Sequence, residues 1–192
     1  PPNKLIASHP YFDHQKWRTG TVYMNGETYQ GIPLKYDLTK DAIIIKATLK
    51  KDVLKLVHLN SLYVDSVKFG PHLFVHSRNF AENGNERIFY EQVYLNNDPA
   101  LGYFIHYSKQ YLEQYTNIAP QGRFSDTKEK RFLLLNGKTY EVNSRRNILK
   151  AFPKNQRRSV RTFMRKNDIK YRRASNKQIN QLMKFCYDQL ID

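Results

Sequence analysis

Histidines that share a strand or lie near a carboxylate are the first residues in this chain that could bind a metal. His72 and His76 can lie on one face of a strand, and His9, Asp13 and His14 gather near the N-terminus. A zinc site normally needs three or four converging ligands, and neither group supplies a full set. We therefore predict ordinary surface or half-buried histidines and no metal.

Oxygen ligands at alternate positions form a second candidate site. Asp37, Thr39 and Asp41 resemble the start of a calcium loop, but the glycine and the distal glutamate of such a loop are missing, which favours a polar turn. The sequence has no glycine-rich phosphate loop, nucleophile elbow or HEXXH zinc motif. Its only cysteine, Cys186, has Leu182 at helical spacing and is predicted to be a buried thiol. We predict no cofactor and no catalytic residue.

Two further functions would need residues that only the fold brings together. The 14 Tyr, 11 Phe and single Trp could form a platform for stacking sugars or bases, although β-rich domains more often use such residues in the core. A hydrolase site assembled from scattered His, Asp and Tyr stays open, because catalytic groups can converge without a local motif. The absence of any such motif favours a noncatalytic protein.

The strongest chemical signal is positive charge near the C-terminus. The chain has a net charge of +15, and between Arg145 and Arg173 twelve Lys or Arg accompany the single acid Asp168, a local charge of +11. On a helix, this density places cations around most of the circumference and presents them to a partner. The predicted partner-binding residues are Arg145, Arg146, Lys150, Lys154, Arg157, Arg158, Arg161, Arg165, Lys166, Arg172 and Arg173.

Three classes of partner carry the complementary charge: nucleic-acid phosphate, anionic lipid head groups and an acidic protein surface. The chain has no zinc-finger spacing, RNP-type aromatic motif or clear helix-turn-helix signature that would select nucleic acid. Alternatively, the cations form a solvated face or pair with acids in the rest of the chain. A role in solubility alone does not explain this segment well, because repulsion between so many neighbouring cations lowers the stability of the helices.

The elements that position these cations begin with strands. From residue 21 to about 112, short runs of Val, Ile, Tyr and Phe alternate with Gly, Asn, Asp and Pro, which is typical of an antiparallel meander. Asn25-Gly26 predicts the turn of a first hairpin, after which Gly31 and Pro33 bend or end the strand. Further strands are predicted at 42–47, 53–59, 62–69, 72–77 and 87–95.

A second Asn-Gly turn, at Asn136-Gly137, predicts a hairpin that opens the C-terminal part. Helices follow: Ser144 caps the first, and Ser175 begins the last with the spacing of a capping box. The helix between them has an apolar stripe of Val160, Phe163 and Met164.

The fold class predicted is therefore α+β, an antiparallel β-meander that forms an open barrel or curved sheet, followed by a C-terminal hairpin and a basic helical segment. A chain of 192 residues can fold as one domain. We predict a single domain over 1–192, with a β-rich body at 21–118 and an appended subdomain at 131–192.

Several of these motifs also resemble those of uncharacterised β-rich cell-envelope proteins of Gram-negative bacteria. The resemblance rests on Gly20-Thr21-Val22-Tyr23, residues 34–38, residues 43–46, Phe132-Leu133-Leu134, Gly137, Lys138, Tyr140 and Ser144-Arg145-Arg146. It implies a periplasmic or outer-membrane-associated protein whose signal peptide has been removed before Pro1. It brings no reaction and no catalytic residue.

Charge and resemblance together predict a noncatalytic binding or scaffold domain of the bacterial cell envelope. Its basic C-terminal helices would dock an acidic protein subunit or anionic lipid head groups, as part of an envelope complex. No transmembrane segment is predicted, since the chain has no long apolar run. A nucleic-acid-binding module is the alternative.

Overall fold

The computed structural model describes residues 8–13, 15–48, 53–79, 88–96, 101–113 and 122–191. The chain divides into two compact units. Unit 1 comprises Pro1–Asn79, Asn83–Tyr90 and Tyr107–Glu129; unit 2 comprises Phe80–Glu82, Glu91–His106 and Lys130–Asp192. Pro1 and His14 lie outside the described residues, and the single domain over 1–192 stays a prediction.

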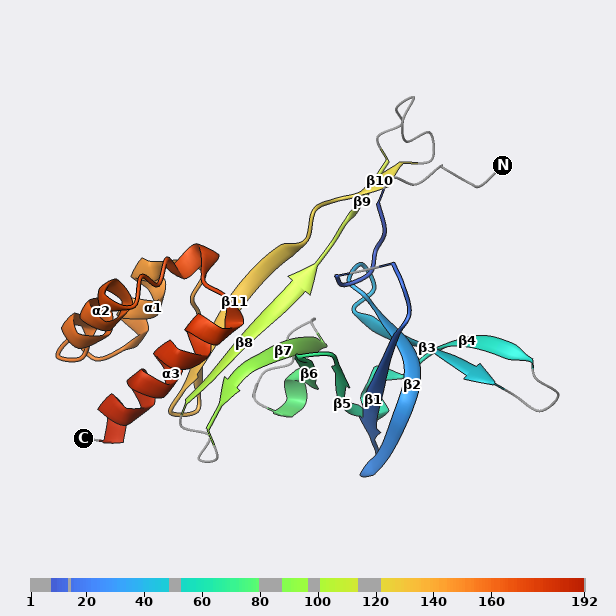
Figure 1. Ribbon diagram of the computed structural model, residues 1–192, viewed down its shortest axis with the longest axis horizontal. Coiled ribbons are helices and arrows are strands. Elements are labelled where there is room, and N and C mark those ends of the chain that lie inside the picture. The colour runs from blue at the N-terminus through green and yellow to red at the C-terminus, as the bar shows by residue number, and fades with distance from the viewer. Residues whose placement is uncertain are drawn as a thin grey trace. The chain divides into compact units, whose positions relative to one another are not determined.

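Unit 1 is an antiparallel sheet in the strand order β6-β5-β1-β2-β3-β4 (Figure 1). The strands are β1 (Arg18–Met24), β2 (Glu27–Asp37), β3 (Ala42–Thr48), β4 (Leu54–His58), β5 (Val64–Phe69) and β6 (His72–His76). The 3-10 helices η1 (Ser61–Tyr63) and η2 (Ser77–Asn79) and the paired strands β9 (Tyr111–Leu112) and β10 (Arg123–Phe124) complete the described elements. The predicted antiparallel meander is confirmed.

Both predicted Asn-Gly turns are present. Asn25 and Gly26 have φ angles of 53° and 78°, and Asn136 and Gly137 have φ angles of 48° and 74°. Positive φ at both central residues is the geometry of a tight two-residue hairpin turn, which Asn and Gly adopt at little cost. These two dipeptides therefore fix the register of their hairpins.

Of the two alternatives predicted at Gly31, a bend or an end of the strand, the structure has a β-bulge, which bends a strand. Strand β2 does not end there but continues to Asp37. The pairing moves from Gly20–Ile32 to Val22–Tyr29, which leaves one extra residue on β2. Gly31 has a φ of 70° beside this bulge, a conformation that glycine adopts without strain. The β-bulge accommodates the extra residue, so β2 continues beyond Gly31.

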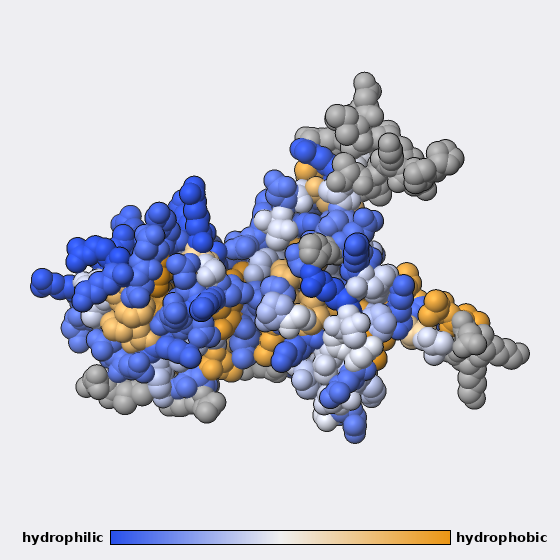
Figure 2. Space-filling model, viewed as in Figure 1, coloured by the Kyte–Doolittle hydropathy of each residue, from blue (hydrophilic) through white to orange (hydrophobic). Residues whose placement is uncertain are grey.

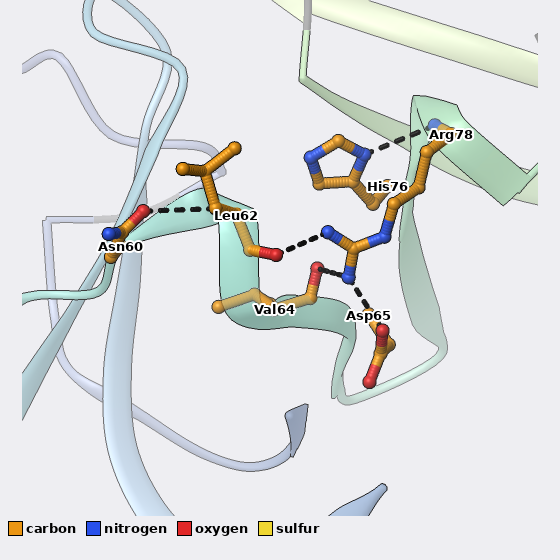
Figure 3. A network of polar contacts seen from close by, with 6 residues as sticks. All are labelled: Asn60, Leu62, Val64, Asp65, His76 and Arg78. Atoms are coloured by element: carbon orange, nitrogen blue, oxygen red, sulfur yellow. Dashed lines mark hydrogen bonds and ion pairs between the residues drawn. The ribbon is translucent and has the colours of Figure 1, made fainter. Parts of the chain in front are cut away.

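Hydrogen bonds donated by the Arg78 guanidinium hold one corner of unit 1 together (Figure 3). Nη2 donates to the carbonyl oxygen of Val64 at 3.1 Å and to Asp65 at 2.6 Å, and Nη1 donates to the carbonyl oxygen of Leu62. The Arg78 backbone N–H donates to Nδ1 of His76 at 3.1 Å, so this nitrogen must carry a lone pair. Burial, followed by the charge of Arg78, lowers the pKa of His76, which favours the neutral ring.

Unit 2 joins a sheet to three helices (Figure 1). The sheet order is β12-β11-β8-β7, from β7 (Phe89–Leu95), β8 (Leu101–Ser108), β11 (Lys128–Leu135) and β12 (Lys138–Glu141). Two residues at one end of each of β7, β8 and β11 belong to unit 1. The helices are α1 (Arg145–Ala151), α2 (Arg157–Lys166), the 3-10 turn η3 (Tyr171–Arg173) and α3 (Asn176–Ile191). Helices after an antiparallel sheet confirm the predicted α+β class.

Helix α3 starts where the sequence predicts. The backbone N–H of Gln178 donates to Oγ of Ser175 at 3.3 Å, and the N–H of Ser175 donates to Oε1 of Gln178 at 3.1 Å, which confirms the capping box. The helix buries Leu182 and Cys186, and burial raises the pKa of the Cys186 thiol to about 12. The predicted buried thiol is confirmed, and it is a poor nucleophile.

A buried pair of tyrosines ties the helical segment to the sheet of unit 2. The hydroxyl groups of Tyr103 and Tyr171 lie 2.8 Å apart, and Tyr171 also donates to the carbonyl oxygen of Val142. Tyr171 is 3% exposed, and burial raises the pKa of its hydroxyl far above the ordinary value. The hydroxyl therefore stays protonated and always has a hydrogen to donate.

The substitution Tyr171→Phe tests this connection. It leaves the buried Val142 carbonyl without its donor, so we expect the free energy of unfolding to fall by about 1–3 kcal/mol. Urea denaturation followed by circular dichroism measures the change. Tyr140→Phe is the matched control, since Tyr140 is 37% exposed and its loss of a hydroxyl should change stability little. Equal stability of both variants would contradict this role of Tyr171.

Candidate anion-binding site

The basic segment begins with α1, a short helix with a clear start and end. The hydroxyl oxygen of Ser144 accepts a hydrogen bond from the backbone N–H of Asn147 at 3.2 Å, which confirms the predicted cap. Ile148 and Leu149 are buried, while Arg145, Arg146 and Lys150 are exposed. The chain leaves the helix at Phe152, before Pro153, which cannot continue it.

Helix α2 separates its apolar and charged side chains. Val160 and Met164 are buried, and the ring of Phe163 stacks on Phe185 of α3 with centroids 4.2 Å apart. The predicted apolar stripe is thus confirmed. With that stripe facing inward, the arginines and the terminal lysine of α2 lie on the remaining surface, where Arg158, Arg161, Arg165 and Lys166 are exposed.

An open pocket of about 660 Å³ lies between α1 and α2. We call it the basic pocket. Five of its six lining residues are cations from the two helices, and the sixth is the side chain of Leu149. The lining residues are Arg145, Arg146, Leu149, Lys150, Arg157 and Arg161. Residues 16 positions apart in sequence therefore share one concave, positively charged site.

Arg157 is the member of the basic pocket whose position is fixed by hydrogen bonds. Its Nε donates to the carbonyl oxygen of Phe152 at 2.8 Å, and its Nη2 donates to the carbonyl oxygen of Lys150 at 2.9 Å. These carbonyls are at the C-terminal end of α1, where a cation is favoured by the helix dipole and by the unsatisfied acceptors. One arginine thus ties the two helices together at the pocket.

The cations of the basic pocket have no acidic partner in the described part of the chain. Ion pairs of the described residues include Arg18 with Asp13, Arg78 with Asp65 and Lys170 with Asp168, and the last is an exposed pair at 3.9 Å. No Asp or Glu lines the pocket. The interpretation that acids of the body neutralise this segment therefore finds no support among the described residues.

The remaining predicted site residues lie elsewhere on the helical segment. A smaller pocket of about 270 Å³ is lined by Arg145 and Arg165, together with Met164, Asp168, Ile169, Lys170 and Tyr171. Lys154, Arg158, Lys166, Arg172 and Arg173 are exposed and line neither pocket. The eleven cations thus form one dense cluster of five and a looser surrounding surface.

The lining residues that were not predicted from the sequence include Leu149 and Lys170. Leu149 forms part of the basic pocket although it is apolar, and Lys170 lines the smaller pocket beside Asp168. Leu149 could have been found, because it lies four residues after Arg145 and three after Arg146 on the same helix. Lys170 carries no such signal, since it lies outside a helix.

The sites rejected on sequence grounds have structural roles. Oδ1 of Asp37 accepts hydrogen bonds from the backbone N–H groups of Thr39 and Lys40 at 2.9 and 3.2 Å, which confirms the polar turn. His72 packs against the ring of Phe12, with ring centroids 4.9 Å apart. Among the described residues, no group of three or more His, Cys, Asp or Glu side chains is placed to hold a metal ion.

Comparison with protein-family models, with curated proteins and with solved structures finds no match to this chain. Within the described segments, none of the helices is both long and apolar enough to cross a bilayer.

The connection between α1 and α2 can be tested with Arg157→Lys. An ammonium keeps the charge but loses the planar fork that reaches two carbonyls, so we expect about 1 kcal/mol lower stability in urea denaturation. The neighbouring exchange Arg158→Lys is the control, because Arg158 is exposed and makes no side-chain hydrogen bond to a described residue. A loss of the same size in both variants would show that the two carbonyl contacts contribute nothing.

Proposed function

We propose that this protein is a noncatalytic binding or scaffold module that docks an acidic segment of a partner protein in its basic pocket. The observation that carries the proposal is the convergence of five cations from α1 and α2 on one concavity that no acid lines. Like charges held together cost stability unless a partner compensates them. A carboxylate-rich segment supplies that compensation.

The surface around the basic pocket favours an acidic protein over a lipid bilayer. Proteins that lie on membranes usually insert large apolar side chains beside their cations. The large hydrophobic side chains that are exposed in the described residues include none on α1 or α2. Carboxylates also suit the arginines of the basic pocket, because each can accept a pair of hydrogen bonds from a guanidinium group.

A nucleic-acid-binding module is the second candidate. Four of the five cations in the basic pocket are arginines, whose planar guanidinium groups bind phosphate oxygens in pairs. The aromatic stacking platform that single-stranded nucleic acid commonly uses has no counterpart in the lining of the pocket. Acidic protein therefore remains the first choice.

The proposed setting is the bacterial cell envelope, within an assembly of the periplasm or outer membrane. This part of the proposal is supported by the resemblance of the sequence motifs and by the preference for a protein partner. In such a compartment, genomic nucleic acid would not compete for the basic pocket.

Binding of a fluorescent oligo-glutamate peptide tests the proposal. In the double variant Arg146→Gln with Arg161→Gln, we expect the dissociation constant to rise at least about tenfold, because two pocket charges are lost. Fluorescence anisotropy at low and at physiological salt measures it. The matched control is Lys154→Gln with Arg158→Gln, which removes the same charge outside the basic pocket and should leave affinity within about twofold.

Two results would contradict the proposal. Equal weakening by both double variants would show that net charge, and not the basic pocket, attracts the peptide. Tighter binding of a single-stranded oligonucleotide of equal charge, lost in the pocket variant, would instead make nucleic acid the partner. Vesicles with anionic lipid provide the third arm, and there we expect weak binding that salt removes.

A further inference from the structure

Strand β4 is an exposed edge strand of unit 1. It is the last strand in the sheet order, and no described strand lies beyond it. All five of its residues are exposed, although three of them are apolar. Leu54 and Leu56 are 66% and 63% exposed, and Val53 just before the strand is 50% exposed. Figure 2 shows this hydrophobic surface at the β4 end of unit 1.

The pairing with β3 determines which backbone groups of β4 are free. Leu59 donates its N–H to the carbonyl oxygen of Ile43, so these residues form a hydrogen-bonded pair. Hydrogen-bonded and non-hydrogen-bonded pairs alternate along an antiparallel ladder. In the observed register, Lys55 and Val57 therefore bond to β3, while the N–H and C=O groups of Leu54, Leu56 and His58 face away from it.

Apolar and charged side chains alternate from Leu54 to Leu56 in β4 and so determine which side chains an added strand should carry. Leu54 and Leu56 project from one face and Lys55 from the other, since successive residues of a strand point to opposite sides. A strand laid beside β4 would cover the leucines with apolar side chains and place carboxylates next to Lys55. Natural edge strands are usually short, charged or covered, and this one combines open backbone with exposed leucines.

We propose that β4 accepts an extended segment of a partner protein in which apolar and acidic residues alternate. The segment pairs with the outward N–H and C=O groups of Leu54, Leu56 and His58 and extends the sheet by one strand. This surface lies in unit 1 and is independent of the basic pocket of unit 2. A second copy of the chain is the poorer occupant, because two molecules of net charge +15 repel each other.

The test uses a short fluorescent peptide of alternating Val and Glu. A Gly and Glu peptide of the same length and charge serves as the control, because it can reach the basic pocket but has little tendency to form a strand. Amide hydrogen exchange is measured by NMR with and without each peptide. We expect the Val and Glu peptide alone to slow exchange at the amides of Leu54, Leu56 and His58.

Leu56→Pro removes one outward N–H without removing a bond to β3, and proline is tolerated at such edge positions. Leu56→Ala is its matched control, since alanine loses the side chain but keeps the N–H. With both substitutions made in the basic-pocket variant Arg146→Gln with Arg161→Gln, so that only β4 binding is measured, we expect Leu56→Pro to bind the Val and Glu peptide at least about tenfold more weakly than Leu56→Ala.

Three outcomes would overturn the inference: unchanged exchange at these amides, equal affinity of the two variants, or protection of the same amides by a second copy without peptide. If Leu56→Pro does not fold, amide exchange in the unaltered protein decides alone. The basic-pocket variant Arg146→Gln with Arg161→Gln should retain the peptide at β4, so failure of one proposal is distinguishable from failure of the other.

Discussion

Burial of the apolar stripe of α2 is the constraint on which the helical part of unit 2 depends. Each like-charged pair three or four residues apart on a helix costs about 0.2–0.5 kcal/mol, and Arg157, Arg161 and Arg165 form such a series. Full burial of a side chain such as Val160 or Met164 contributes about 1.5–3 kcal/mol. Packing therefore outweighs the repulsion, and the helix is held with its cations directed outward. The basic pocket is a consequence of this balance.

The contacts that support the stripe are few and specific. Phe163 stacks on Phe185, Arg157 binds the last carbonyls of α1, and Tyr171 connects the segment to the sheet of unit 2. None of these contacts neutralises the arginines. The backbone that carries the arginines is therefore fixed while their charges stay available. Such a surface can bind a partner without rearrangement, so less conformational entropy is lost on binding. This is the physical basis for preferring a binding function.

The local features of the fold could be predicted from the sequence. The Asn-Gly turns, the Ser144 cap, the Ser175 capping box and the stripe of α2 each depend on residues close together in the chain. Gly31 shows the limit of such reasoning, because the sequence leaves open whether the strand bends or ends there, and only the pairing with β1 shows a bulge within a continuous strand. Residues close together in the chain determine where helices and hairpin turns begin and end. Pairing with an adjacent strand determines whether a glycine ends a strand or forms a bulge within it.

Features that depend on the arrangement of elements could not be predicted. The sequence predicts eleven candidate cations, but only the approach of α1 and α2, with Pro153 between them, selects five for one pocket. Similarly, the sequence predicts a strand at 53–59, whereas its exposure follows from its place at the end of the sheet order. Sequence periodicity does not distinguish an edge strand from an interior one when both carry leucine and valine.

An NMR titration with oligo-glutamate, followed through the side-chain Nε–Hε signals of the arginines, tests most directly whether the basic pocket is a defined binding site. We expect the signals of Arg145, Arg146, Arg157 and Arg161 to shift together and saturate, while those of Arg172 and Arg173 change little. Uniform, unsaturated shifts across all arginines between Arg145 and Arg173 would contradict it, because they would show a diffuse attraction to net charge and no defined site.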